Sequence, residues 1–360
     1  MDSFIAVFDA NFPQADVEEI GHRLLALDCL VPGFVPPAAG LLDLRALAYA
    51  EHVDELDTVV LVDRNLASRM AQLASEGALR KWDKPTEVAI NLMAFAQAMN
   101  FDIEPGLAFH ELAHRGGNGT AQKELSWFRA ADRGAATKWI DVAMRRTQTI
   151  NLGPVATLES HDMAAPLKRW NRNYIAMLKI ADLALRGGRA LSSILSLLDW
   201  MIDDFILAGP AFMYAARYFG PRAASGKMLK SLWAPDREKA ILGVRNAAWD
   251  VTYVSEFGRL SGLRDAKKRQ YIFATADHAL WEIAVTPFCG PEPTEDFPAL
   301  VGKLELWWPP QDARKIHDRY FECVEHVRGG RNRGADLPGD PIGDMIAAGE
   351  AWLRNPLTKA

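Results

Sequence analysis

Four acidic residues, far apart in the sequence, have the types and positions to hold a metal ion. They are Asp63, Glu111, Asp250 and Asp277. Asp63 follows the apolar run 59–62, and Asp277 follows the apolar run 271–276. A carboxylate directly after a buried strand lies at the carboxyl edge of a parallel sheet, where open α/β folds bind ligands. Converging carboxylates repel one another unless a divalent cation holds them, so the pattern predicts metal-assisted phosphodiester hydrolysis.

Asp63 and Asp277 each have a second interpretation as the first residue of a helix or turn. Aspartate is common at both places because its side chain accepts hydrogen bonds from the backbone that follows. The joint pattern favours a site, since Asn65 lies two residues after Asp63 and Thr275 lies two residues before Asp277. We expect Asn65 and Thr275 to orient the two acids through hydrogen bonds.

The order of these motifs resembles that of PIN-domain and PIN-like nucleases. Those proteins begin with a strand ending in Asp-x-Asn, here 63–65, and carry a glutamate on a later helix, here Glu111. Their second half has an aspartate at a helix start, here Asp250, and a strand ending in Thr-x-Asp, here 275–277. The resemblance covers about 55–150 and 240–290, and it requires a large insertion between Glu111 and Asp250.

The resemblance implies an α/β fold with a three-layer α/β/α core and a mainly parallel sheet. It also implies a nuclease that binds Mg²⁺ or Mn²⁺ on the four acids and cleaves RNA, single-stranded or structured. A second Asp-x-Asn, 9–11 after the run 4–8, is an alternative start of the motif. Asp63 is favoured because its strand is richer in β-branched residues and a long amphipathic helix follows. A catalytically silent PIN-like scaffold or a regulatory subunit stays open.

A different metal chemistry overlaps the proposed glutamate. Residues 110–114 read His-Glu-Leu-Ala-His, which is the HExxH pattern of zinc metalloproteases. On a helix, His110 and His114 would face one Zn²⁺ ion while Glu111 served as the general base.

The zinc pattern lacks a clear third ligand. Its extended form places Gly117 correctly but has Thr120 where a further histidine is needed. Glu124 and Glu159 are the alternatives for that position. We expect residues 115–117 to end the helix, because they include two glycines. The zinc protease is therefore the alternative hypothesis, and it leaves the three aspartates unexplained.

Composition sets the wider frame. A chain of 360 residues with 49% hydrophobic types can bury a sizeable core and suggests about two structural units. The three cysteines are too few and too widely spaced for a disulfide framework, so we expect a reducing, cytoplasmic location. We expect no membrane segment, since aspartates interrupt the apolar stretch 191–208. A homo-oligomer or a protein partner stays open.

Two groups of basic residues are candidates for contact with nucleic acid. The net charge of −5 argues against a protein that coats nucleic acid through its overall field, but a nuclease needs only a local basic rim. The groups are Lys168, Arg169 and Arg172, interleaved with aromatic residues, and Lys267, Lys268 and Arg269, between the last two acids. Each group is also compatible with an ordinary solvated helix face.

Periodicity and Gly/Pro punctuation divide the chain into four parts. They are an N-terminal accessory segment (1–55), an α/β core (56–150 and 238–290), a helical insertion (151–237) and a helical C-terminal segment (291–360). Helices are expected near 15–27, 65–75, 86–99, 106–114, 311–327 and 341–354. No internal repeat is evident.

Overall fold

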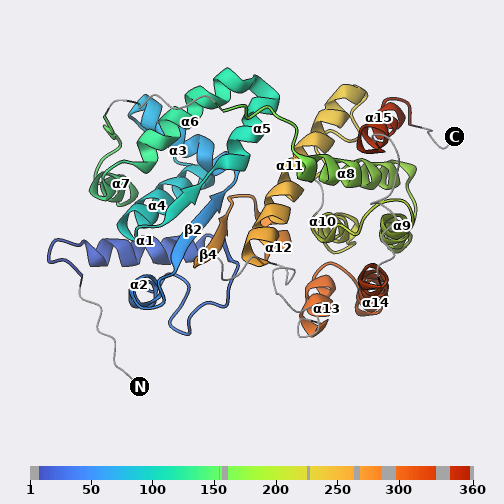
Figure 1. Ribbon diagram of the computed structural model, residues 1–360, viewed down its shortest axis with the longest axis horizontal. Helices are drawn as coiled ribbons and strands as arrows, with labels where there is room; N and C mark the ends of the chain where they lie inside the picture. The colour runs from blue at the N-terminus through green and yellow to red at the C-terminus, as the bar shows by residue number, and fades with distance from the viewer. Residues whose placement is uncertain are drawn as a thin grey trace. The chain divides into compact units, whose positions relative to one another are not determined.

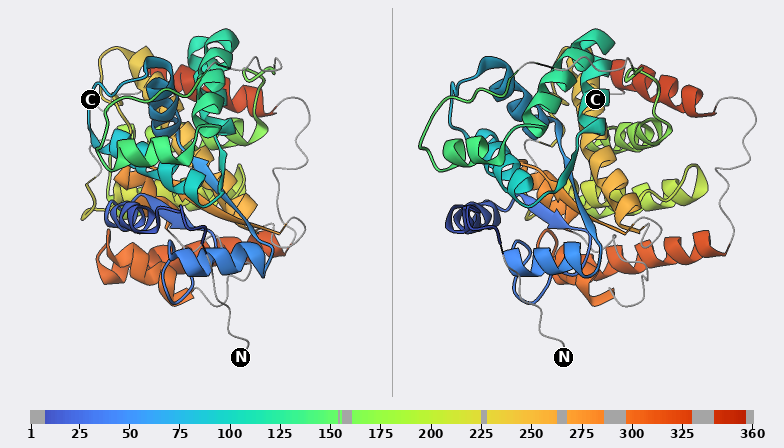
Figure 2. Two further views of the ribbon diagram at one scale, coloured as in Figure 1. Left: turned by 90° about the vertical axis from the view of Figure 1, so that its left-hand side faces the viewer. Right: turned by 60° about the vertical axis from the view of Figure 1, so that its left-hand side comes forward.

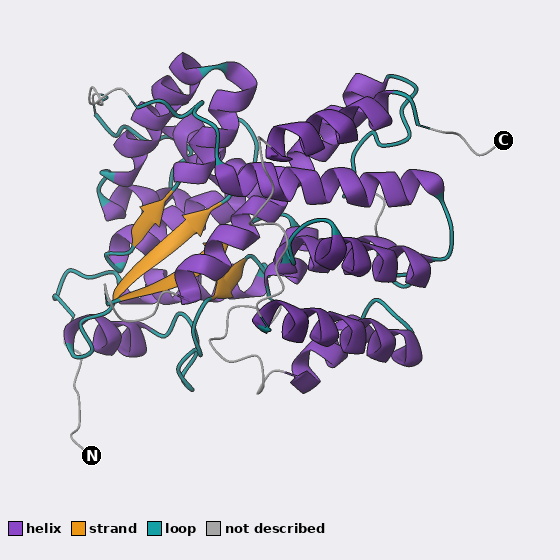
Figure 3. Cartoon of the chain, turned by 45° about the vertical axis from the view of Figure 1, so that its right-hand side comes forward, coloured by secondary structure: helices purple, strands orange, loops and turns teal. Residues whose placement is uncertain are grey.

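The computed structural model describes residues 8–153, 155, 161–224, 228–262, 268–285, 297–329 and 341–356. The chain forms two compact units: unit 1 is Met1–Ala165 with Phe257–Val285, and unit 2 is Pro166–Glu256 with Thr286–Ala360. The described residues form fifteen helices and four strands, so the protein is α/β and mostly helical (Figures 1 and 3).

Unit 1 contains a small mixed sheet with the strand order β1-β4-β2-β3. The strands are β1 (Leu30–Pro32), β2 (Asp57–Val62), β3 (Asp102–Glu104) and β4 (Arg269–Ala274). Strand β2 runs parallel to both of its neighbours, β3 and β4, whereas β1 pairs antiparallel with β4. The carboxyl ends of β2, β3 and β4 therefore meet at one edge.

The helices of unit 1 surround this sheet. They are α1 (Gln14–Ala26), α2 (Leu44–His52), α3 (Arg64–Glu76), α4 (Lys84–Ala98), α5 (Gly106–Gly116), α6 (Asn118–Asp132), α7 (Ala136–Ala143) and α12 (His278–Ala284). Helix α1, dark blue in Figures 1 and 2, packs against α4 and α7. Alternate sheet residues, including Val60 and Ile272, belong to the hydrophobic core shared with these helices. Phe273 lies between Ile272 and Ala274 on β4, so its side chain points to the other face of the sheet. It contacts Phe257 there, with ring centroids 5.8 Å apart.

Local sequence explains why α3 begins and ends where it does. The Asp63 side chain accepts a hydrogen bond from Leu66 N at the first turn, and this satisfies a backbone donor that has no partner within the helix. Gly77 ends the helix with φ +67°, a conformation that glycine adopts without steric penalty. Strand β2 and helix α3 therefore meet at Asp63 with no intervening loop.

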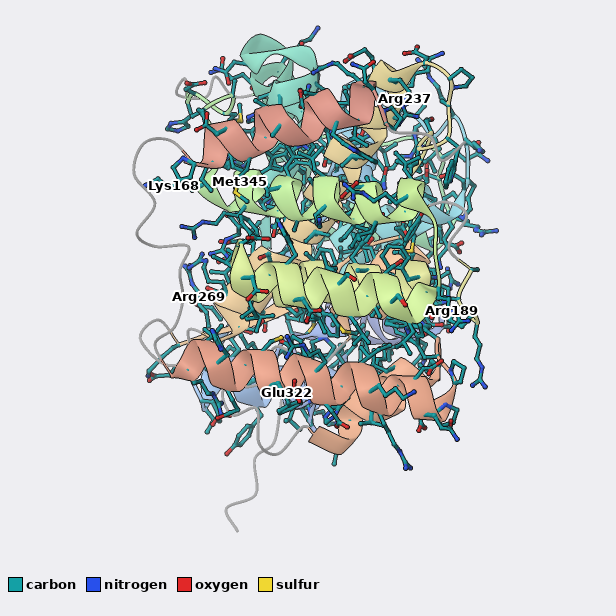
Figure 4. All side chains as sticks on the ribbon, turned by 90° about the vertical axis from the view of Figure 1, so that its right-hand side faces the viewer. Lys168, Arg189, Arg237, Arg269, Glu322 and Met345 are labelled. Atoms are coloured by element: carbon teal, nitrogen blue, oxygen red, sulfur yellow. The ribbon has the colours of Figure 1, made fainter. Side chains whose placement is uncertain are left out.

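Unit 2 is helical in its described part. Its helices are α8 (Lys168–Arg186), α9 (Ala190–Asp203), α10 (Gly209–Phe219), α11 (Arg237–Gly262), α13 (Phe297–Glu305), α14 (Pro310–Arg328) and α15 (Pro341–Arg354), and the last turns of α11 belong to unit 1. Figure 4 shows α15, α8, α9 and α14 side by side, with Met345 labelled on α15 and Glu322 on α14. The Glu350 carboxylate of α15 joins this helix to α8 and α11. It accepts hydrogen bonds from Tyr174 of α8 and from Arg245 of α11, each at 2.6 Å.

In the described part of the chain, no helix is both long and apolar enough to cross a bilayer.

The arrangement of unit 1 differs from the sequence-based division in two respects. Residues 1–55, expected to form an accessory segment, contribute α1, α2 and the edge strand β1 to unit 1. Asp250, expected at a helix start, lies in the middle of α11 and belongs to unit 2. The residues before Asp250 continue a helical pattern back to Arg237, so the helix begins earlier than the motif suggested.

Candidate active site

Asp63 and Asp277 leave neighbouring parallel strands at the same edge of the sheet. The last residues of the two strands, Val62 and Ala274, are paired in register. The ladder continues one step further, since the Asp63 N–H donates to the Ala274 carbonyl at 3.2 Å. This register brings the segment 275–277 level with Asp63.

Thr275 connects the two aspartates. Its buried hydroxyl donates to Asp63 Oδ2 at 2.6 Å and accepts a hydrogen bond from the Asp277 backbone N–H at 3.0 Å. Its own N–H donates to the Cys29 carbonyl at 2.9 Å, which ties the segment to the chain before β1. Thr275 thus forms a hydrogen bond to the Asp63 carboxylate, as expected from the sequence.

The Asp63 carboxylate is in an unusual electrostatic environment. It is only 3% exposed, and this burial raises its pKa to about 6. The hydrogen bonds from Thr275 and from Leu66 N oppose the increase, while the charge of Asp277 adds to it. A buried acid next to a second acid favours a bound proton or a bound cation, because either one relieves the repulsion.

Both aspartates also cap the helices that follow them. Asp63 Oδ1 accepts from Leu66 N at 2.9 Å at the start of α3. Asp277 Oδ1 accepts from Ala279 N at 2.9 Å and from Leu280 N at 3.2 Å at the start of α12. The capping role predicted as an alternative is therefore present, and it leaves lone pairs on both carboxylates, each of which has about four acceptor positions.

A third acid at this edge was missed by the sequence analysis. Glu104 is the last residue of β3, and its Oε1 accepts a hydrogen bond from Gly106 N at 2.6 Å as α5 begins. Strand β3 is too short to show a periodic pattern, so the sequence carried no signal for it.

Glu111 lies on α5, which starts from the same edge. Its side chain is 9% exposed. The neighbouring His110 is half-buried, and its Nδ1 is 2.8 Å from the Met163 carbonyl. The exposed His114 places its Nδ1 2.8 Å from the carbonyl of His110. One ring nitrogen of each histidine is therefore engaged with backbone oxygen.

The proposed third zinc ligands do not complete an HExxH site. Glu124 forms a two-pronged ion pair with Arg64, with nitrogen to oxygen distances of 2.7 and 2.9 Å. The Thr120 hydroxyl donates to the Gly116 carbonyl, and Glu159 lies outside the described residues. Across the residues that the structure describes, no cluster of three or more His, Cys, Asp or Glu side chains is placed to hold a metal ion.

The oxygen ligands at the sheet edge fit a hard divalent cation better than zinc. Mg²⁺ commonly binds through one or two carboxylates and retains several waters, so it does not need a cluster of three acids. Asp63 and Asp277 supply such a pair, and both hydrogen bonds accepted by the Asp277 carboxylate within the described residues go to Oδ1. The donor set is all oxygen, as Mg²⁺ and Mn²⁺ prefer.

The structure places three other predicted residues, Asn65, Asp250 and Asp9, as follows. Asn65 is exposed on the first turn of α3, and its backbone N–H helps to stabilise the Asp63 carboxylate. Asp250 is in unit 2 on α11. Asp9 is exposed ahead of α1 and accepts a hydrogen bond from Asn11 N, while most of the run before it lies outside the described residues.

The described residues of the second predicted basic group, Lys268 and Arg269, do not lie beside the two aspartates of unit 1. Lys268 and Arg269 lie at the amino end of β4, the opposite edge of the sheet from Asp277, and Lys268 pairs with Glu55. Lys267 lies outside the described residues.

The first basic group lies on α8 in unit 2. Lys168 and Arg172 are exposed there, whereas Arg169 pairs with Glu256 at 3.1 Å. The aromatic residues of this segment are not free to stack on bases, since Trp170 stacks on the buried Tyr174 with centroids 4.9 Å apart.

No protein-family model, no curated protein and no solved structure matches this chain.

Proposed function

We propose that this protein is a divalent-metal-dependent nuclease with an α/β/α PIN-like core, and that it hydrolyses RNA. The observation that carries the proposal is the hydrogen-bonded link Asp63–Thr275–Asp277 at the carboxyl ends of β2 and β4. Ligands of open α/β sheets bind at this edge. The preference for RNA follows from the resemblance to PIN-like nucleases.

In this proposal Asp63 and Asp277 hold Mg²⁺ or Mn²⁺. The bound cation would activate a water molecule and neutralise charge on the scissile phosphate. Thr275 keeps Asp63 in place through the 2.6 Å hydrogen bond, so that the carboxylate needs little rearrangement to bind. Glu111 and Asp250 remain predicted contributors from the sequence.

The test uses the full-length protein, a labelled single-stranded RNA and either Mg²⁺ or Mn²⁺. Asparagine is as good a helix cap as aspartate, so Asp63→Asn and Asp277→Asn remove the charge while retaining both caps. We expect each variant to lose more than about 100-fold in cleavage rate, since even residues that only support a metal ligand contribute about 10- to 100-fold. Thr275→Val should fall within that smaller range. Asp250→Asn and Glu111→Gln test the two remaining acids.

The histidine variants are the matched comparison. His110→Gln and His114→Gln should keep cleavage within a few-fold of the wild type, and thermal unfolding should show that every variant is folded. Activity that survives both aspartate variants, disappears with either histidine variant and returns on adding Zn²⁺ after chelation would instead support a zinc protease. Wild-type protein that cleaves no RNA with either metal would contradict the nuclease and favour a silent scaffold or a regulatory subunit.

A further inference from the structure

Two loops of unit 1 form a pocket at the far end of α3 from Asp63. The loop after α3 and the loop after α7 pair through an isolated antiparallel bridge between Ala78 and Thr149. On either side of it, Leu79 N donates to the Gln148 carbonyl at 2.9 Å and Ile150 N donates to the Gly77 carbonyl at 2.8 Å. These bonds hold the two loops together as a small ladder.

The pocket beside this ladder is rich in cations. It has a volume of about 270 Å³, and its lining residues are Leu79, Arg80, Lys81, Trp82, Arg145, Thr147 and Gln148. Three of these seven residues are cationic and none is acidic. This volume lies just below the range of about 300–1,000 Å³ for ligand pockets, so it suits a single small ligand.

Arg145 lies against an aromatic ring directly after the end of α7. Its guanidinium carbon lies over the Trp82 ring, 4.6 Å from the ring centroid. The backbone φ of Arg145 is +58°, a left-handed value that residues other than glycine rarely adopt. This left-handed residue closes α7, because the next N–H, that of Arg146, donates back to the Asp141 carbonyl at 2.8 Å.

Acidic residues anchor the three cations. Arg80 pairs with Glu76 at 2.7 Å, Lys81 with Asp83 at 3.3 Å and Arg145 with Glu87 at 3.7 Å. The acidic side chains are 24%, 21% and 27% exposed, whereas the cationic ones are 76%, 77% and 63% exposed. The cationic groups are thus more exposed than the acids with which they pair. Arg69 forms a second ion pair with Asp83.

We infer that this pocket binds the phosphate and base of one nucleotide. Arginine and lysine recognise phosphate oxygens, and a guanidinium plane fixed on tryptophan offers its outer face for a base to stack on. The nucleotide is either free or part of a single strand. Helix α3 has 13 residues and separates the pocket from Asp63 by about 20 Å, so this is a second site that does not depend on a metal.

Binding of adenosine 5′-monophosphate to the full-length protein, measured by calorimetry in EDTA, tests the inference. EDTA removes any divalent cation, so the carboxylate edge does not contribute. We expect saturable binding that weakens as salt is raised. Arg145→Gly should weaken it about tenfold or more, and so should the double variant Arg80→Gln, Lys81→Gln, because each loses hydrogen bonds to a charged group.

The variants separate loss of the ligand site from loss of the fold. Glycine accepts φ +58° readily, so Arg145→Gly removes the guanidinium and relaxes the backbone without lowering the melting temperature. Arg186 is the matched control, since it lies over Trp352 in unit 2 at 5.4 Å, and Arg186→Gln should leave binding unchanged. Binding that is absent in the wild type, or unaffected by both pocket variants, would overturn the inference.

The choice of probe tests the chemistry of the ligand. Inorganic phosphate and adenosine should each bind more weakly than the nucleotide, and equal binding of either one would overturn the assignment. A short oligoadenylate that binds more tightly than the mononucleotide would identify a strand as the source, and equal or weaker binding would identify the free nucleotide.

Discussion

The burial of Asp63 makes the stability of the protein depend on pH in a defined direction. Its pKa is raised from 3.8 to about 6 in the folded protein, mainly by desolvation. The folded state therefore binds a proton more readily than the unfolded state between these values, and the free energy of unfolding falls as pH rises through that window. Relative to Asp63→Asn, which cannot titrate, the wild type should lose on the order of 2 kcal/mol between pH 4 and pH 7.

Urea unfolding of both proteins at several pH values measures this difference. The comparison cancels the titration of the other acids, which the two proteins share. Mg²⁺ should restore part of the lost stability at pH 7 in the wild type alone, if it binds the ionised Asp63. Unfolding curves whose midpoints change in parallel with pH would show that the Asp63 carboxylate is not perturbed.

At the level of single residues, the sequence singled out Asp63 and Asp277 because each follows a strand long enough to be recognised, and Thr275 because of its spacing to Asp277. The same reasoning could not find the cationic pocket. Trp82 and Arg145 lie in two loops about 60 residues apart in sequence, and only the pairing of Ala78 with Thr149 brings those loops together. Such contacts depend on long-range pairing, and local periodicity carries no information about them.

Two helix glycines provide an opposed pair of tests for the packing of unit 2. A Cβ on Gly243 of α11 would clash with the Lys230 carbonyl oxygen, so Gly243→Ala should destabilise by about 1–3 kcal/mol or more. A Cβ on Gly302 of α13 would meet nothing within 4 Å, and Gly302→Ala should stabilise by about 0.5–1 kcal/mol through helix propensity. Chemical denaturation gives both values. A neutral Gly243→Ala would mean that α11 does not approach the 228–232 segment this closely.

Among the elements, long helices were predictable and short strands were not. The expected helices at 65–75 and 341–354 correspond to α3 (Arg64–Glu76) and α15 (Pro341–Arg354), because each has a clear amphipathic period. Strands β1 and β3 have three residues each, too few for a period of two to show. The position of β1 beside β4 depends on tertiary pairing alone, which is why the antiparallel edge was not expected.

At the scale of the whole molecule, unit 1 is built from two segments that lie far apart in the sequence. Strand β4 comes from the second segment, yet it lies between β1 and β2 and pairs with both. Thr275 and Asp277 directly follow β4, so the sheet and the proposed active site are completed by the same segment. Unit 2 interrupts unit 1 in sequence without interrupting its sheet.

This arrangement predicts that a chain ending at Ala165 does not fold, even though it contains most of unit 1. Removing β4 would leave β2 with an exposed edge and the buried Val60 and Val62 without their neighbours Ile272 and Ala274. We expect that fragment to be poorly soluble, with no cooperative thermal unfolding by circular dichroism. Joining 1–165 to 257–285 through a flexible Gly/Ser linker should restore a cooperative transition, because it returns β4 to its place. A fragment 1–165 that unfolds cooperatively by itself would show that β4 is dispensable to the sheet.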